Sequence, residues 1–328
     1  MQAAYYERTG PASEVLVVGS VPDPQPGTGE VRVRLRWSGV NPSDVKSRAG
    51  LRSSVLPFPR IIPHSDGMGV IDAVGAGVPA QRVGERVWIW NAAWGRAFGT
   101  AAQYVVLPQA QAVALPDGVA DEAGACLGIP ALTALHATLA QGGVEGRSVL
   151  VAGAAGAVGH YAVQFARLLG ARQVLATVSN AGKAALATEA GAHVAINYRE
   201  GKVAEQVRDA TQGAGVDRVI EVDVAANGAL DADIVRSGGE WLVYGSGQGQ
   251  FNLPFFPLIV KNQSLHFFIV YNLTPEDRRR AETVLTRFLV KGALVHNIAQ
   301  RLPLAQIAAA HELIERGEAI GNVVLAIP

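Results

Sequence analysis

The chain has 328 residues, of which 49% are apolar and 17% are charged, and this composition excludes a disordered chain and predicts about two domains. Lysine plus arginine equals aspartate plus glutamate at 28 each, and this neutral balance excludes a general attraction to nucleic acid or to an anionic membrane. The one cysteine, Cys126, excludes a disulfide within the chain and a cysteine-rich zinc cluster, and its apolar neighbours predict a buried side chain.

The N-terminal segment MQAAYYERTG lacks the basic stretch and the apolar run of a secretory signal. The sequence has no uninterrupted run of about 18 apolar residues, so we expect no membrane helix. We therefore expect a cytoplasmic protein with neither a membrane nor a nucleic acid as its partner.

The chain up to about residue 120 is typical of a compact β-rich domain. In residues 30–40, EVRVRLRWSGV, the alternation places Val31, Val33, Leu35 and Trp37 on one face and arginines on the other, as in a half-buried strand. Further strands are predicted for GVIDAV, RVWIW and AQYVVL, with the turn clusters PDPQPGTGE and NPSD between elements.

After Leu115-Pro116-Asp117 the pattern changes to alternating strands and helices. The predicted helices are GHYAVQFARLLG and NAGKAALATEAG, and the predicted strands are SVLVAG, RQVLATV, HVAINY, DRVIEV and EWLVYGS. This alternation predicts an α/β domain with a doubly wound parallel sheet. After about residue 270 both kinds of element mix, and the chain ends in the strand-like NVVLAIP.

A glycine-rich turn joins a strand to a helix within residues 149–171, VLVAGAAGAVGHYAVQFARLLGA. In the dinucleotide fingerprint G-x-G-x-x-G, Ala154 stands at the first glycine, and Gly153 precedes it. Because the turn begins a helix, its backbone N–H groups are expected to bind a pyrophosphate. Alternatively, the glycines only allow the helix to pack closely on the strand. The turn residues expected at the cofactor are Gly153, Ala155, Gly156, Ala157, Val158 and Gly159.

The second strand indicates which dinucleotide binds. A free ribose 2′-hydroxyl calls for an acid about 20 residues past the glycines, but ATVSNAGK contains none. Thr177, Ser179 and Asn180 offer hydrogen bonds and Lys183 offers a positive charge, a set that suits a 2′-phosphate. The sequence therefore favours NADPH over NADH, unless Lys183 is an ordinary solvated helix residue.

With these motifs in order, the chain resembles the zinc-free quinone oxidoreductase (zeta-crystallin-like) branch of the medium-chain dehydrogenase/reductase superfamily. The resemblance covers nearly the whole chain through GVNPSDVKSRAG, IIPHSDGMGVIDAVGAGV, RVGERVW, GTAAQYVVLP, the glycine turn, AGAHVAINYRE and LAQIAAAHELIERGEAIGNVVL. It implies a GroES-like β-rich catalytic domain from residues 1–122 and 271–328. It also implies an inserted Rossmann NADPH-binding domain at 123–270 and an active site in the cleft.

Zinc-dependent alcohol dehydrogenases of the superfamily would carry a cysteine near Asn41, a G-H-E motif and a four-cysteine loop. Here, alignment on the nearby glycines puts His64 at the glycine of G-H-E, Ser65 at its histidine and Asp66 at its glutamate. The seven histidines show no ligand spacing, so we expect no metal. His64 is either a hydrogen-bonding residue of the cleft or an ordinary loop residue.

Without a zinc ion, hydrogen-bond donors must stabilise the acceptor oxygen, and this favours conjugated acceptors such as quinones and enones. By resemblance, Asn41 bonds the substrate oxygen and Asp44 anchors the loop. Lys46 replaces a tyrosine common in the branch, and either contacts a phosphate or carbonyl or is simply solvated. The loop VWIWNAAWGRAFG, with Trp90 and Trp94, offers an aromatic surface for a flat quinone, although some of its tryptophans are expected in the core.

The resemblance also implies cofactor residues outside the glycine turn. Some are expected near the nicotinamide or the adenosine, some at the carboxyl edge of the sheet, and one stands where relatives often have lysine. In chain order these residues are Thr133, Tyr198, Asn227, Tyr244, Gly245, Ser246 and Asn322.

The apolar run SLHFFIVYNL, residues 264–273, is either a sheet edge that pairs across a two-fold in a homodimer or a buried internal strand. Three functions remain open. The first is an NADPH-dependent quinone reductase, the second an enone or alkenal double-bond reductase, and the third a non-catalytic NADPH-binding protein.

Overall fold

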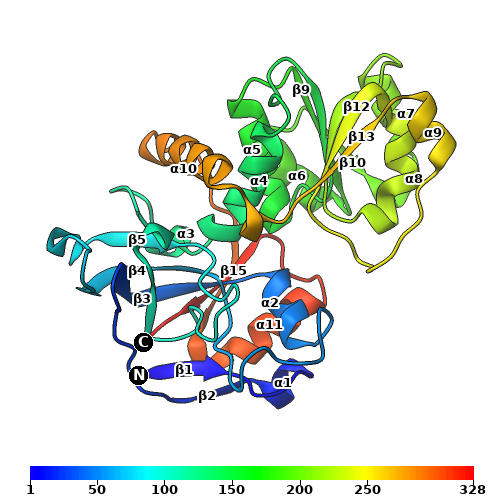
Figure 1. Ribbon diagram of the computed structural model, residues 1–328. Helices are drawn as coiled ribbons and strands as arrows, with labels where there is room; N and C mark the ends of the chain where they lie inside the picture. The colour runs from blue at the N-terminus through cyan, green and yellow to red at the C-terminus, as the bar shows by residue number, and fades with distance from the viewer. The chain divides into compact units, whose positions relative to one another are not determined.

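The computed structural model describes all 328 residues, and the chain divides into two compact units (Figure 1). Met1–Pro130 and Thr286–Pro328 form the first unit, and Ala131–Leu285 forms the second. The domain boundaries inferred from the sequence, at residues 122 and 270, lie earlier in the chain and remain a proposal. No helix combines the length and the apolar character that a membrane span requires.

The first unit is built around a seven-stranded sheet in the order β14-β15-β3-β4-β5-β7, with β6 paired to β3. Both ends of the chain meet in this sheet, because β15 runs antiparallel beside β3. Its strands are β3 (Glu30–Val40), β4 (Asp66–Val74), β5 (Arg86–Ile89), β6 (Tyr104–Pro108), β7 (Ala112–Ala114), β14 (Ile298–Pro303) and β15 (Asn322–Ala326).

A small sheet and short helices complete the first unit, which has the β-rich, GroES-like character expected from the sequence. The small sheet pairs β1 (Gln2–Tyr5) with β2 (Val17–Ser20). The helices are α1 (Ala12–Val15), α2 (Pro42–Arg48), α3 (Asp121–Gly124) and α11 (Ile307–Glu315).

Strand β3 follows the predicted alternation only as far as Leu35. Val31, Val33 and Leu35 are buried in the core, as predicted. The pairing with β4 then shifts register between Leu35 and Trp37, which adds one residue to β3. Because a shift of one residue exchanges the two faces, Trp37 is only half-buried and Ser38 is fully buried.

The second unit has a six-stranded, all-parallel sheet in the order β10-β9-β8-β11-β12-β13, which confirms the predicted doubly wound Rossmann fold. The chain reverses direction across the sheet between β8 and β11, and ligands bind such sheets outside the carboxyl ends of the strands at this point. The strands are β8 (Ser148–Val151), β9 (Gln173–Val178), β10 (Val194–Asn197), β11 (Val216–Glu221), β12 (Val235–Val243) and β13 (Ser264–Phe267).

Helices connect these strands, and α10 crosses the boundary between the two units. The strand β13, from the apolar run 264–273, lies at an edge of the sheet, so the alternative of an internal strand does not hold. The helices are α4 (Leu132–Leu139), α5 (Ala157–Leu168), α6 (Ala181–Glu189), α7 (Val203–Ala210), α8 (Val224–Ile234), α9 (Phe255–Val260) and α10 (Pro275–Val290).

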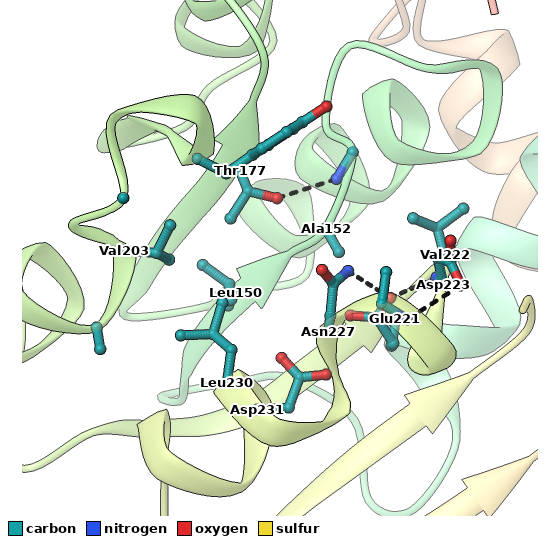
Figure 2. Close-up of a pocket in the computed structure, with 15 residues that line it drawn as sticks. Leu150, Ala152, Thr177, Val203, Glu221, Val222, Asp223, Asn227, Leu230 and Asp231 are labelled. Atoms are coloured by element: carbon teal, nitrogen blue, oxygen red, sulfur yellow. Dashed lines mark hydrogen bonds between the residues drawn. The ribbon is translucent and has the colours of Figure 1, made fainter. Parts of the chain in front are cut away.

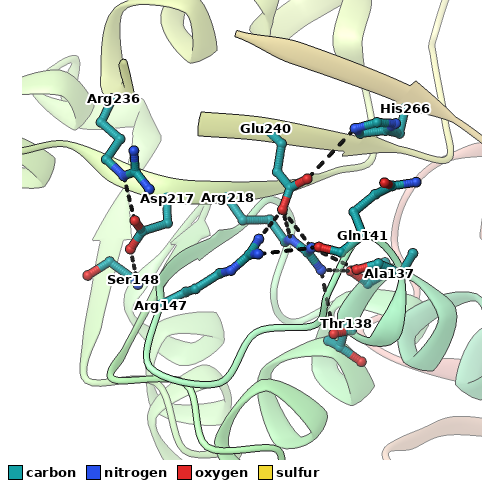
Figure 3. Close-up of polar contacts among 11 residues, drawn as sticks. Ala137, Thr138, Gln141, Arg147, Ser148, Asp217, Arg218, Arg236, Glu240 and His266 are labelled. Atoms are coloured by element: carbon teal, nitrogen blue, oxygen red, sulfur yellow. Dashed lines mark hydrogen bonds and ion pairs between the residues drawn. The ribbon is translucent and has the colours of Figure 1, made fainter. Parts of the chain in front are cut away.

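A buried arginine ties α4 to this sheet (Figure 3). Arg218 on β11 is fully buried and donates to the carbonyl oxygens of Ala137 at 2.9 Å and Ala140 at 2.8 Å, at the end of α4. The Glu240 carboxylate on β12 accepts a further hydrogen bond from Arg218 at 2.7 Å. The guanidinium thus satisfies carbonyl groups that a helix end leaves unpaired, and Glu240 balances its charge.

Candidate active site

In the first unit, Asn41 is the N-cap of α2, and Pro42 occupies the first helical position. Asp44, three residues after the cap, turns back so that its Oδ2 accepts from the Asn41 backbone N–H at 2.8 Å. Both side chains are buried. Burial raises the pKa of Asp44 to about 7, although the bond from Asn41 opposes the shift. Asp44 therefore anchors the backbone that carries Asn41.

The Asn41 amide is held by a second carboxyl group. Its Nδ2 donates to Oδ2 of Asp66 at 2.9 Å, and the same oxygen accepts from the backbone N–H of Ile129 at 3.0 Å. Asp66 is fully buried, and burial raises its pKa well above the usual range. Since an amide nitrogen has two hydrogens, this arrangement orients Asn41 and leaves one hydrogen for a ligand oxygen.

His64 lies behind this cluster in the interior of the first unit. It is fully buried, its Nδ1 is 2.9 Å from Oγ of Ser38, and its Nε2 is 2.9 Å from Nε2 of His311. Burial lowers the pKa of His64 to about 3, so the ring is neutral. His64 is therefore no ordinary solvated loop residue. No group of three or more His, Cys, Asp or Glu side chains is placed to hold a metal ion.

In the second unit, the backbone of the glycine turn lies so close to the start of α5 that a side chain at Gly159 would not fit. Gly153 has a φ of +65° and donates its N–H to Oγ1 of Thr177 at 3.2 Å. A Cβ at Gly159 would lie 2.3 Å from the carbonyl oxygen of Gly153. Gly156 is the N-cap of α5, so the first N–H groups of that helix lack helical acceptors. A turn of this shape fits the pyrophosphate of a dinucleotide.

The end of β9 also fits a phosphate. No acid lies between Val178 and the first turn of α6, a stretch that instead offers Ser179, the N-cap Asn180 and Lys183. The Asn180 side chain accepts from the Lys183 backbone N–H at 2.9 Å, and its amide hydrogens remain for a ligand. A cation in a first turn opposes the helix dipole, and a bound phosphate would offset this cost. Oγ1 of Thr177, expected near the 2′-phosphate, also holds the glycine turn by accepting from the Gly153 N–H.

A cavity of about 530 Å³ opens at the carboxyl edge of the sheet (Figure 2), a size typical of small-molecule sites. It brings together three residues predicted to bind the cofactor, Gly153, Tyr198 and Asn227, together with Thr177. Tyr198 follows β10 and is half-exposed. The glycine turn and the residue after β10 therefore share one cavity, as an adenosine site requires.

Two buried carboxyl groups line the same cavity, and Figure 2 labels both. Oε1 of Glu221, at the end of β11, accepts from Nδ2 of Asn227 at 2.9 Å. Oδ2 of Asp231 has no hydrogen-bond partner. Burial raises the pKa of Glu221, and burial together with the neighbouring Glu221 raises the pKa of Asp231. Asn227 is thus tied to an acid that the sequence analysis did not select.

The last four residues predicted in the second unit do not line this cavity. Thr133 lies buried in the first turn of α4. Tyr244, Gly245 and Ser246 follow the end of β12, next to β11. A Cβ at Gly245 would lie 2.1 Å from the carbonyl oxygen of Val222, so glycine is required there by close backbone approach.

Three further predictions fall in the first unit. Lys46 lies half-buried in the last turn of α2. Asn322 starts β15 and donates its side-chain Nδ2 to the carbonyl oxygen of Asn297 at 2.9 Å, so this hydrogen bond is made within its own unit. In the tryptophan-rich segment, Trp88 belongs to the core, whereas Trp94 is 40% exposed.

Sequence reasoning missed several polar residues of these sites. Ser38, Thr100 and His311 meet only through tertiary contacts, and no spacing in the sequence points to them. A usable signal did exist for Glu221, because an acid that ends an apolar strand faces the ligand edge of a parallel sheet.

Comparison with known proteins places these features in a family. Residues 27–117 match the family described as "Alcohol dehydrogenase GroES-like domain", and residues 157–288 match "Zinc-binding dehydrogenase". A human quinone oxidoreductase is 31% identical over 325 residues, which cover 98% of this chain and 95% of that protein.

Two solved structures are similar over nearly their full lengths. An NAD-dependent alcohol dehydrogenase has a TM-score of 0.91 and 31% identity, with 100% of both chains covered. A mycobacterial protein solved in complex with NADPH has a TM-score of 0.85 and 29% identity, with 99% of both chains covered. The chain therefore belongs to the medium-chain dehydrogenase/reductase superfamily, within its quinone oxidoreductase branch.

Proposed function

We propose that this protein is an NADPH-dependent quinone oxidoreductase that works without zinc. The observation that carries the proposal is the glycine turn at the reversal point of the sheet, followed by a phosphate-binding set and no acid after β9. The human relative named a quinone oxidoreductase and the structural neighbour that binds NADPH support it.

NADPH, when bound, supplies the hydride that reduces the acceptor. The N–H groups of Ala157 and Val158 at the start of α5 would hold its pyrophosphate, and Gly159 allows α5 to pack closely against the turn that presents them. The 2′-phosphate is expected at the segment from Ser179 to Lys183. These residues bind and orient the cofactor, and they take no part in proton transfer.

The chain's contribution on the acceptor side is the Asn41 amide. Its remaining hydrogen donates to the acceptor oxygen as negative charge develops there. Asp66 holds the amide and Asp44 holds the backbone, so the donor is in place before the reaction begins. A neutral amide stabilises a developing oxyanion less strongly than a metal cation would. A quinone suits this weaker donor because conjugation spreads the negative charge over the ring.

NADPH oxidation measured in parallel with a 1,4-quinone and a small enone tests the proposal. We expect turnover with the quinone at a kcat/KM at least about tenfold above that for the enone, equivalent to roughly 1.4 kcal/mol. Turnover of the enone alone would make the protein a double-bond reductase. NADPH binding without turnover of either would make it a non-catalytic binding protein.

We further propose a homodimer located in the cytoplasm. The edge strand β13 carries Phe267, which is 59% exposed, and an uncovered apolar edge of a parallel sheet invites pairing with a second copy. The buried, unpaired Cys126 suits a reducing compartment. Light scattering on the protein as it leaves a size-exclusion column is expected to give twice the chain mass of 34.3 kDa.

A further inference from the structure

His64 adopts a backbone conformation that residues other than glycine rarely take, with φ at +78°. A fully buried residue stays in such a conformation only when its surroundings compensate for the cost. Here both ring nitrogens have partners, Ser38 at Nδ1 and His311 at Nε2. The proposed contact of Asn41 with the acceptor makes no direct use of this imidazole.

The hydrogen bonds around His64 have a fixed direction. Thr100 gives its only hydroxyl hydrogen to the backbone carbonyl oxygen of Asp66. Oγ of Ser38 lies 2.8 Å from Oγ1 of Thr100, so Ser38 must donate in that bond. Ser38 then has no hydrogen left, and Nδ1 of His64, 2.9 Å away, must carry one.

The second histidine extends this order. Burial keeps His64 neutral, so its Nε2 bears a lone pair and accepts from Nε2–H of His311 at 2.9 Å. Nδ1 of His311 is then an acceptor, and this buried atom has no hydrogen-bond partner. A neutral ring of this tautomer leaves a lone pair there and no unpaired N–H group. Every donor in the chain from His311 onward points toward Asp66.

The chain ends on a peptide carbonyl, which cannot take up a proton, so it orients groups and delivers no proton. Asp66 is also the residue whose carboxyl group holds Asn41. We propose that His64 and His311 are positioning residues, which act through the two hydroxyl groups to hold Asp66 and thereby the Asn41 amide. This inference rests on the proposed role of Asn41 in quinone reduction.

Two variants of His64 test the role by kinetics. His64→Gly accepts the left-handed backbone without strain and removes the imidazole, whereas His64→Asn tolerates the same φ and keeps an amide that can bond Ser38. We expect His64→Gly to lower kcat with a quinone about tenfold or more, with partial recovery in His64→Asn and NADPH affinity unchanged. An unchanged kcat in folded His64→Gly would overturn the proposal.

A spectroscopic measurement tests the same inference without activity. In ¹⁵N spectra of protein labelled at histidine and asparagine, we expect the Nδ1–H tautomer for His64 and the Nε2–H tautomer for His311. The Asn41 side-chain NH₂ signals should move in His64→Gly. If the wild-type protein fails to reduce quinones, the proposed function is wrong, whereas other tautomers or unmoved Asn41 signals would refute the positioning role.

Discussion

The substitution Gly159→Ala tests the glycine turn most sharply. The new Cβ would lie 2.3 Å from the carbonyl oxygen of Gly153 and 2.8 Å from Cα of Ala154, and both atoms belong to the backbone. No side chain can move aside, so the strand and helix must separate by about 1 Å to restore an ordinary contact. Overpacking of this kind costs about 1–3 kcal/mol, while alanine regains roughly 1 kcal/mol in helix propensity.

We therefore expect Gly159→Ala to lower the free energy of unfolding by up to about 2 kcal/mol. NADPH affinity should fall at least about tenfold, because the N–H groups that face the pyrophosphate move with the helix. Gly249→Ala is the control, since an added Cβ there meets no atom within 4 Å and Gly249 belongs to none of the proposed binding segments. Calorimetric titration and urea denaturation measure both effects. NADPH binding by Gly159→Ala at wild-type affinity would refute the assignment of this turn to the cofactor.

Three further substitutions have expected outcomes. Lys183→Ala should weaken NADPH binding about tenfold and leave NADH binding unchanged, as measured by calorimetry, because only the 2′-phosphate contact is lost; an equal loss for both cofactors would contradict this role. Folding raises the pKa of Asp44 from 3.8 to about 7, so between these pH values the folded protein keeps a proton that the unfolded chain has released. The stability that this proton contributes is fully present below pH 3.8 and is lost as the pH rises toward 7. Asp44→Asn should flatten that decline, of which about 3 kcal/mol falls between pH 5 and pH 8, the two values at which urea denaturation is measured. An unchanged slope would exclude Asp44 as its source. Arg218→Met leaves Glu240 without its most buried partner and should lower the free energy of unfolding by about 3 kcal/mol or more. The control Arg208→Met removes a half-exposed ion pair and should change it by less than about 1 kcal/mol. Equal losses of stability in the two variants would refute the role of Arg218.

Local patterns predicted the parts of the fold that depend on local chemistry. The alternation of β3 located the strand and its buried face as far as Leu35, and the glycines located the turn between β8 and α5. The extra residue after Leu35 has no sequence signal, because a bulge depends on the pairing with β4. Ser38 is therefore buried, although the alternation predicted that Trp37 would be the buried residue.

Contacts between distant segments could not be predicted from one sequence. His64 and His311 are separated by 247 positions, and contacts such as the pairing of β15 with β3 bring both ends of the chain into one unit. Thr177 illustrates the same limit, since nothing in the sequence indicated that its hydroxyl oxygen accepts from the Gly153 N–H. The family resemblance identified Asn41 and Asp44, whereas the carboxyl group that holds Asn41 became clear only in the fold.

Calorimetric titration of the intact protein with NADPH and, separately, with NADH tests the central claim most directly. The account predicts that NADPH binds at least about tenfold more tightly, because the segment after β9 offers a lysine and no acid to the ribose. Equal affinity for the two cofactors, or binding of neither, would contradict it.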